Sequence, residues 1–306
     1  MAEYEQAVGL FEQSLAISRE IGHRQGEASS LNNLGYASYG VAEYERAIDF
    51  YQQSLPIFRE IGNRHGEALS LNNLGNASYS LAEYERAIDF YQQSLAISRE
   101  IGDRQEEAAS LNNLGNAYDS VAEYERAIDF FEQSLAIFRE IGDRREEGGS
   151  LNNLGNVYNS LAEYERAIDF FEQSLAISRE VGDRQREACS FNNLGNVYNS
   201  LAEYERAIDF FEQSLAISRE VGDRQVEALS LNNLGNAYDS LAEYERAFDF
   251  YQQSLAISRE ISDRQGEAGS LNALGNAYES LAEYERAVAL YEQSLAIARE
   301  IGDRSG

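Results

Sequence analysis

Apolar residues recur along this chain with the spacing of two successive amphipathic helices in every stretch of 40 residues. In one such stretch, Ala28, Leu31 and Leu34 begin a series of apolar or small residues that falls on one side of a helix at about 100° per residue. The segment EYERAIDFYQQSLAISREI at residues 83–101 repeats the helical spacing. The pattern therefore predicts a pair of helices in each stretch.

The segments between these pairs carry helix stop and start signals. Gly102 is suited to the left-handed conformation that follows a helix, and Asp103 is suited to the N-cap of the next helix. Neither helix of a pair can bury its apolar stripe alone, so neighbouring pairs are expected to stack.

The period itself sets the domain organisation. The string LNNLGNAY or a close variant starts at Leu31 and recurs every 40 residues. We number positions within a repeat from Ala28 as position 1 and name its two helices the first and second helix. We predict one array over residues 1–306. It comprises an unpaired second helix of a partial repeat at 1–22, seven repeats at 23–302 and a trailing linker at 303–306.

This repeat resembles the tetratricopeptide repeat. The large apolar residue at position 4, Leu at 7, Gly at 8, Tyr at 11, Ala at 20 and aromatic residue at 24 of that motif match Leu111, Leu114, Gly115, Tyr118, Ala127 and Phe131. The 40-residue form is similar to repeats of kinesin light chains, Pins-type spindle adaptors and cyanobacterial proteins. The resemblance implies an all-α fold, a right-handed superhelix of stacked antiparallel helix hairpins with about 15 helices.

Several residues depart from that motif. Ser38 and Ser78 stand where the motif has Tyr, and Tyr39 and Tyr79 follow one place along. Ala replaces the usual Gly at position 15. Pro56 removes one backbone donor from a second helix, which we expect to kink locally without breaking.

Charge narrows the range of partners. The chain has 53 acidic and 25 basic residues and a net charge of −28, which disfavours nucleic acid and anionic membranes. The same charge favours encounter with basic segments. The charged residues lie mostly at positions 16, 18, 22, 33, 36 and 40, where we expect a solvated outer face. No apolar run approaches the ~18 residues of a membrane span. A single cysteine, Cys189, fits a reducing compartment, and we predict a cytoplasmic protein.

A polar stripe lies opposite the apolar side of each first helix, at positions 2, 5, 6, 9, 12 and 13. In tetratricopeptide superhelices the first helices line the concave surface, so the resemblance implies that this first-helix stripe lines a groove. Asparagine offers both a donor and an acceptor to the backbone of an extended peptide. The predicted peptide-binding residues are Asn32, Asn72, Asn76, Asn112, Asn116, Asn152, Asn156, Asn192, Asn196, Asn232, Asn236, Asn272, Asn276, Tyr39, Tyr79, Asp119 and Asp239.

Structural explanations compete with this interpretation. The repeats are near-copies, so their asparagines are not independent observations, and those at position 6 can instead bond between adjacent helices. Positions 2 and 12 vary from repeat to repeat, either to shape the groove or by drift at exposed sites. If they shape the groove, its N-terminal end is more aromatic and its C-terminal end more acidic.

Catalytic chemistry is not indicated. His23 and His65 fall in or beside the segments between repeats at different positions, and Cys189 has no histidine or second cysteine nearby in sequence. These residues form neither a metal set nor a catalytic triad. We predict no enzyme activity, no catalytic residue, no metal site and no cofactor.

Three functions remain open from the sequence. The first is a scaffold that binds an extended peptide or a protein partner in the Asn-lined groove. The second is the sensor or spacer arm of a larger signalling or effector protein. The third is head-to-tail self-association through apolar stripes on the first and last predicted helices, at residues 3–21 and 283–301.

Overall fold

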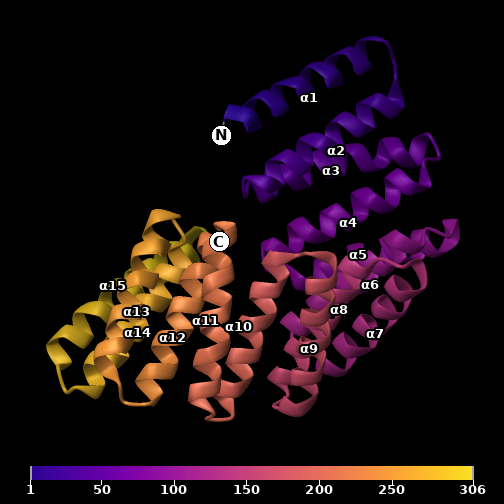
Figure 1. Ribbon diagram of the computed structural model, residues 1–306. Coiled ribbons are helices and arrows are strands. Elements are labelled where there is room, and N and C mark those ends of the chain that lie inside the picture. The colour runs from indigo at the N-terminus through magenta and orange to yellow at the C-terminus, as the bar shows by residue number, and fades with distance from the viewer. Residues whose placement is uncertain (1, 305–306) are drawn as a thin grey trace. The chain divides into compact units, whose positions relative to one another are not determined.

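A computed structural model describes residues 2–304, and Figure 1 shows them as a succession of helices. Residues 2–304 contain fifteen α-helices and no strand. The helices are α1 (Ala2–Glu20), α2 (Arg24–Gly40), α3 (Tyr44–Glu60), α4 (Arg64–Ser80), α5 (Tyr84–Ile101), α6 (Arg104–Ser120), α7 (Tyr124–Ile141), α8 (Arg144–Ser160), α9 (Tyr164–Val181), α10 (Arg184–Ser200), α11 (Tyr204–Val221), α12 (Arg224–Ser240), α13 (Tyr244–Glu260), α14 (Arg264–Ser280) and α15 (Tyr284–Arg304). Even-numbered helices are first helices, and odd-numbered helices are second helices.

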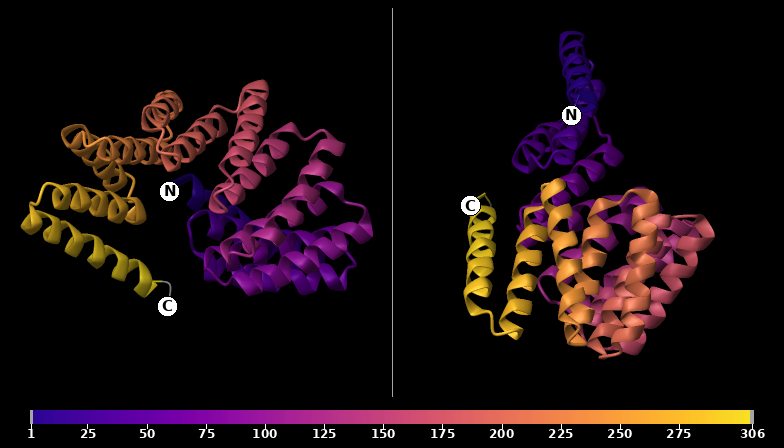
Figure 2. Two further views of the ribbon diagram at one scale, coloured as in Figure 1. Left: turned by 90° about the horizontal axis from the view of Figure 1, so that it is seen from below. Right: turned by 60° about the vertical axis from the view of Figure 1, so that its left-hand side comes forward.

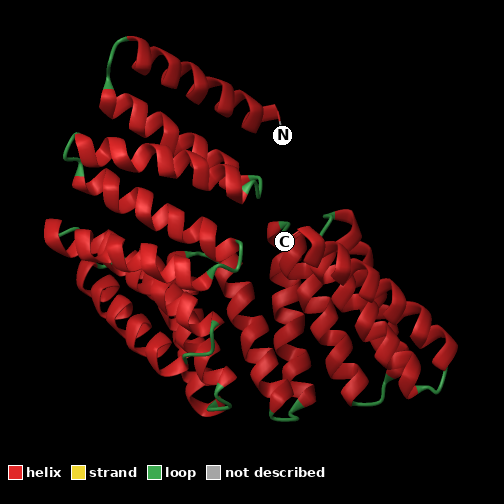
Figure 3. Cartoon of the chain, turned by 180° about the vertical axis from the view of Figure 1, so that it is seen from behind, coloured by secondary structure: helices red, strands yellow, loops and turns green. Residues whose placement is uncertain are grey.

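Short turns join the helices, as Figure 3 shows. Gly102 has a φ of 71° after α5, and the Asp103 carboxylate accepts a hydrogen bond of 3.1 Å from the Glu106 amide at the start of α6. The predicted stop and start signals are confirmed at this junction. Asn63 caps α4 in the same way, accepting a bond of 2.9 Å from the Gly66 amide.

The turn inside each hairpin requires a left-handed residue, and this chain places alanine there. Ala82 has a φ of 59°, and its amide donates to the Tyr79 carbonyl at 2.9 Å. A left-handed conformation costs about 1–2 kcal/mol for a residue with a Cβ atom. Packing of the two helices on either side must offset this cost.

Close approach of the two helices of a hairpin fixes the core. A Cβ atom on Gly195 would lie 2.5 Å from the ring of Phe211, which is 1% exposed. Only glycine lets the aromatic ring of the second helix rest on the backbone of the first. Leu194, which precedes Gly195 in sequence, is also 1% exposed.

The chain divides into two compact units, Met1–Asn153 and Leu154–Gly306, with the boundary inside α8. In the first unit, α2 contacts α4 and α4 contacts α6, whereas α3, α5 and α7 make no such contacts with one another among the described residues. In the second unit, α10, α12 and α14 are likewise in contact in succession. Figure 2 shows the hairpins from two further directions. Each unit, taken by itself, therefore curves toward its first helices.

The charged residues at position 40 do not lie on the solvated outer face that the sequence predicted for them. Glu267 at this position is 7% exposed and accepts bonds from Arg259 at 2.8 Å and Arg264 at 2.5 Å. The bond from Arg259 holds the pKa of Glu267 below its ordinary value of 4.5. The expectation of a solvated carboxylate at position 40 was wrong, because arginines from two helices converge on it.

Two smaller expectations concern helix integrity. α3 runs through Pro56 to Glu60 without a break. α15 continues to Arg304, so Asp303 and Arg304 are helical and do not belong to a trailing linker; residues 305–306 lie outside the described chain. No helix of the described residues is long and apolar enough to cross a membrane.

Candidate functional site

Asparagines at positions 5 and 6 bond to one another across successive repeats. The Asn113 amide nitrogen donates to the Asn72 oxygen at 2.9 Å, and the Asn233 amide donates to the Asn192 oxygen at 3.0 Å. The same bond occurs at 3.4 Å between Asn73 and Asn32 and at 3.2 Å between Asn153 and Asn112. The structural alternative for position 6 is confirmed in these four pairs, and the array itself uses these position-5 oxygens.

Position 9 differs between repeats according to the aromatic residue opposite it. The Tyr91 hydroxyl donates to the Asn76 oxygen at 2.9 Å, and the Tyr251 hydroxyl donates to the Asn236 oxygen at 2.8 Å. Asn276 receives the same bond at 2.7 Å from Tyr291.

Repeats with phenylalanine opposite position 9 leave the asparagine side chain without such a bond. In these repeats Phe131, Phe171 or Phe211 occupies the place of the tyrosine. Within the described part of the chain, no hydrogen bond joins the side-chain amides of Asn116, Asn156 or Asn196 to another residue. All three side chains are half-buried, so each keeps a donor and an acceptor for another molecule.

Position 12 is occupied by tyrosine in α2 and α4. The Tyr39 hydroxyl lies 3.1 Å from the Ser80 hydroxyl, and the Tyr79 hydroxyl lies 2.8 Å from the Ser120 hydroxyl. The Tyr79 ring also lies 5.4 Å from the ring of Tyr84, in an edge-on arrangement. These half-buried tyrosines therefore join consecutive repeats.

The same position carries unpartnered oxygens in later repeats. One side-chain oxygen each of Asn159, Asn199 and Asp239 is buried and has no hydrogen-bond partner among the described residues. Burial raises the pKa of Asp239 and of Asp119 above the ordinary value of 3.8. These oxygens accept no donor from the protein, although an unpaired buried acceptor costs about 1–3 kcal/mol.

The remaining predicted residues differ in exposure. Asn32, Asn72 and Asn192 are buried at 8%, 7% and 2% exposure. Asn112, Asn152 and Asn232 are half-buried, and Asn272 and Asn276 are exposed. Successive first helices within each unit thus bring the stripe together, but its buried members present only part of each amide.

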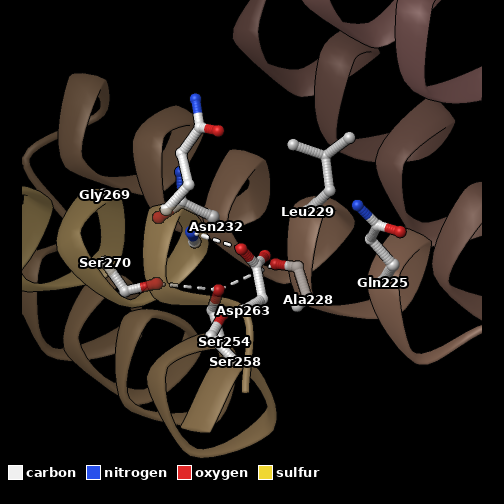
Figure 4. Close-up of a pocket in the computed structure, with 11 residues that line it drawn as sticks. Gln225, Ala228, Leu229, Asn232, Ser254, Ser258, Asp263, Gly269 and Ser270 are labelled. Atoms are coloured by element: carbon white, nitrogen blue, oxygen red, sulfur yellow. Dashed lines mark hydrogen bonds between the residues drawn. The ribbon is translucent and has the colours of Figure 1, made fainter. Parts of the chain in front are cut away.

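Sequence reasoning missed a pocket between α12 and α14. It has a volume of about 320 Å³, and α12, α13 and α14 all contribute to its lining (Figure 4). One signal was available in the sequence, because Ala273 stands where the other six repeats carry asparagine. Among the described residues, no group of three or more His, Cys, Asp or Glu side chains is arranged to hold a metal ion.

Comparison with protein families identifies the class. The tetratricopeptide repeat family matches the chain at residues 1–60, 61–140, 146–220, 186–260 and 226–300. The chain therefore belongs to the tetratricopeptide repeat family, as its motif residues indicated. No curated protein matches the chain.

Solved structures of similar fold include a putative kinesin light chain from Podosopora anserina, whose repeats are nearly identical to one another. Its sequence is 20% identical to this chain, and the TM-score is 0.53 over 63% of this chain and 95% of that one. The Rap conjugation gene regulator of plasmid pLS20, solved in complex with the Phr* peptide, is 15% identical, with a TM-score of 0.69 over 94% of this chain and 78% of that one.

A signal transduction ATPase with a tetratricopeptide repeat sensor, from Pyrococcus horikoshii, is 17% identical. Its TM-score is 0.68, and the match covers 98% of this chain and 49% of that chain. At these identities the three structures establish the shared fold.

Proposed function

We propose that this protein is a non-enzymatic scaffold whose first-helix stripe binds an extended peptide or a segment of a partner protein. The bound chain runs across consecutive first helices on the side toward which each unit curves. Its backbone N–H and C=O groups bond to those side chains at positions 9 and 12 that form no such bond within the described chain.

The observation that carries this proposal is the set of polar groups that the fold leaves unused. The amides of Asn156 and Asn196 bond to no other described residue, and an oxygen of Asn199 and of Asp239 is buried without a partner. Donors from a guest chain would offset the cost of these unpaired acceptors. A role confined to stability would favour residues that bond within the array.

Charge and a similar structure add support. The net charge of −28 favours a basic partner, because opposite charge accelerates encounter at low ionic strength. The Rap regulator of plasmid pLS20 binds a peptide in a fold that this chain shares.

The test is selection of peptides from a random displayed library on the wild-type chain, followed by affinity measurements on a double variant. Asn156→Ala with Asn196→Ala should weaken selected peptides by about thirtyfold, because two hydrogen bonds of about 1 kcal/mol each are lost. The variant should keep its helicity and melting temperature, since the two amides form no bond within the described chain. Recovery of no peptide, or an unchanged affinity, would contradict the proposal.

Asn76→Ala provides the matched control. The Asn76 oxygen accepts from Tyr91 at 2.9 Å and from Asn113 at 3.3 Å. Its removal should destabilise the fold by about 1 kcal/mol through these internal bonds. The contrast separates residues that serve binding from residues that serve folding.

A sensor arm of a larger protein is the second candidate. The fold match to the sensor-bearing ATPase, in which this chain corresponds to 49% of the other, favours it. Sequencing of the flanking reading frame decides the matter: an ATPase or effector domain in frame supports it, and stop codons immediately on both sides remove it.

Self-association remains a further proposal. α1 exposes Leu10 and Ile17 at 57% each, and α15 exposes Val288 at 53% and Leu295 at 51%. Such faces on two different helices could form a heterologous contact between copies. Light scattering that gives the monomer mass at every concentration would reject it.

A further inference from the structure

The pocket between α12 and α14 lies where three contacts found in other repeats are missing. Its lining includes Leu229 and Asn232 of α12, Ser258 of α13, and Asp263 and Gly269 at or near the start of α14. In Figure 4, Leu229 stands across the opening from Gly269. All of these residues belong to the second unit.

The first missing contact is the asparagine bond between repeats. Elsewhere the position-5 oxygen accepts from position 6 of the next repeat, as Asn192 does from Asn233 at 3.0 Å. The residue that should donate to Asn232 is Ala273, which has no amide. The Asn232 oxygen consequently has no hydrogen-bond partner in residues 2–304, and Asn232 lines the pocket.

The second missing contact is a glutamine–aspartate bond. Gln105 donates to Asp143 at 3.0 Å, linking one first helix to the N-cap of the next. Within the described chain, no such bond joins Gln225 to Asp263. One Asp263 oxygen accepts from the Gly266 amide at 2.9 Å, and the other is left without a side-chain donor.

The third difference is at Ser258, which is 1% exposed and lines the pocket. Its hydroxyl has no hydrogen-bond partner in the part of the chain that the structure describes. The equivalent hydroxyls of Ser98 and Ser178 donate to their own helices at 3.0 and 2.9 Å. Side-chain volume is also missing at the rim, because a Cβ atom on Gly269 would meet nothing within 4 Å.

We propose that this pocket receives one basic side chain, lysine or arginine, of a peptide bound along the stripe. The oxygens of Asn232 and Asp263 accept hydrogen bonds from the cationic head. Leu229, 49% exposed, gives the methylene stem an apolar wall. This inference rests on the proposed function and adds to it the kind of side chain that fixes the register of the peptide.

An acidic side chain is disfavoured at this location. In α6 the position of Gly266 is occupied by Glu106, whose pKa is raised by burial and further by the charge of Asp103. Asp263 is the equivalent N-cap carboxylate beside the pocket. An anionic side chain in the pocket would likewise be disfavoured by burial and by repulsion from Asp263. A cationic side chain would instead be attracted to Asp263.

The direct test uses short probes in ligand-observed saturation-transfer NMR with the full chain. The probes are acetyl-Gly-X-Gly-amide, in which X is arginine, lysine, citrulline or norleucine. We expect saturation of the arginine and lysine methylene protons, with binding at least about tenfold weaker for citrulline, which lacks the charge, and for norleucine. Equal binding of all four probes, or binding of none, overturns the inference.

Two variants locate the site. Gly269→Leu fills the pocket with a residue that the chain already carries at the equivalent Leu229, and Cys189→Leu adds the same side chain at that position in α10 as a control. Asp263→Asn removes the charge and keeps an N-cap, as Asn63 does in α4. Arginine-probe binding should fall at least about tenfold in Gly269→Leu and in Asp263→Asn and stay unchanged in the control, Cys189→Leu.

The outcomes separate this inference from the proposed function. Library peptides that bind wild type and Gly269→Leu equally overturn the basic pocket and leave peptide binding intact. A second outcome is that the arginine probe binds and its binding falls in Asp263→Asn, but no peptide longer than the probe is retained. In that case the proposed function fails and the cation site stands alone.

Discussion

Two first helices, α4 in the first unit and α10 in the second, use their aromatic residues differently. In α10, Tyr198 at position 11 is 3% exposed, and its ring stacks at 5.2 Å on Phe210 with the Arg206 guanidinium 4.0 Å from its centre. In α4, the tyrosine stands one residue later, at Tyr79, and position 11 is Ser78 with a buried, unpartnered hydroxyl.

A shift of one residue therefore moves the tyrosine from the core to the stripe. The Tyr79 hydroxyl at position 12 forms a hydrogen bond with the Ser120 hydroxyl of the next repeat. In α10 position 12 is Asn199, whose buried side-chain oxygen accepts no hydrogen bond from any described residue. α10 thus gains core packing and leaves a polar group available, whereas α4 satisfies its stripe at the expense of its core.

The largest effect should come from removing the buried ring in the second unit. Tyr198→Ser should lower the free energy of unfolding by about 3–4 kcal/mol, because a large aromatic side chain leaves the core and a stacked pair is lost. Chemical denaturation followed by circular dichroism measures the change. Tyr39→Ser is the control, since Tyr39 is only half-buried; an equal loss in both variants would contradict the comparison.

The reciprocal exchange should stabilise the first unit. Ser78→Tyr with Tyr79→Asp copies the arrangement of Tyr118 and Asp119 into α4. The new ring would stack on Phe90, over which Arg86 already lies at 5.7 Å. We expect a gain of about 1–2 kcal/mol from apolar burial, measured by the same denaturation. A loss of stability would show that α4 has no room for the ring.

The fold was predictable from the sequence to a greater extent than the candidate site. Leu31 and its counterparts every 40 residues specify the helices and their stacking, because one apolar pattern is repeated almost unchanged. The partners of individual polar groups depend on register between repeats. Asn72 and Asn116 are both asparagine on one stripe, yet Asn72 accepts from Asn113 and Asn116 bonds to nothing through its side chain in the described chain.

The burial of position 40 could not be predicted from the pattern either. Glutamate is usually a surface residue, and Glu267 is covered only because Arg259 and Arg264 meet over it. The pocket at Gly269 arises from several small departures that gain meaning only when they lie together. Such coincidences follow from three-dimensional proximity, which periodicity alone does not supply.

A smaller effect concerns the hydroxyl that closes the stripe in the first unit. Tyr79→Phe removes the bond of 2.8 Å to Ser120 and keeps the ring contact with Tyr84. The expected loss is about 0.5–1 kcal/mol. Hydrogen exchange at the C-terminal ends of α4 and α6 measures it, and exchange in α12 should not change.

The smallest effect is a pH-dependent one in the second unit. Burial raises the pKa of Asp239, so its ionised form disfavours the folded state above the folded pKa and this penalty disappears as pH falls below the unfolded pKa. Asp239→Asn should stabilise the chain at pH 7 by about 0.5 kcal/mol or less. The difference between variant and wild type should vanish near pH 3; a difference that persists there would exclude ionisation as its cause.

The alanines held in the left-handed conformation at the tip of every hairpin make this protein an unusual starting material for engineering. Glycine at Ala42, Ala82 and their five counterparts would relieve backbone strain without touching the helices or the stripe. Thermal tolerance could then be raised in graded increments, one hairpin at a time, while ligand recognition is held constant. A graded series of this kind would reveal how far cooperativity spreads from a single strengthened module along the array.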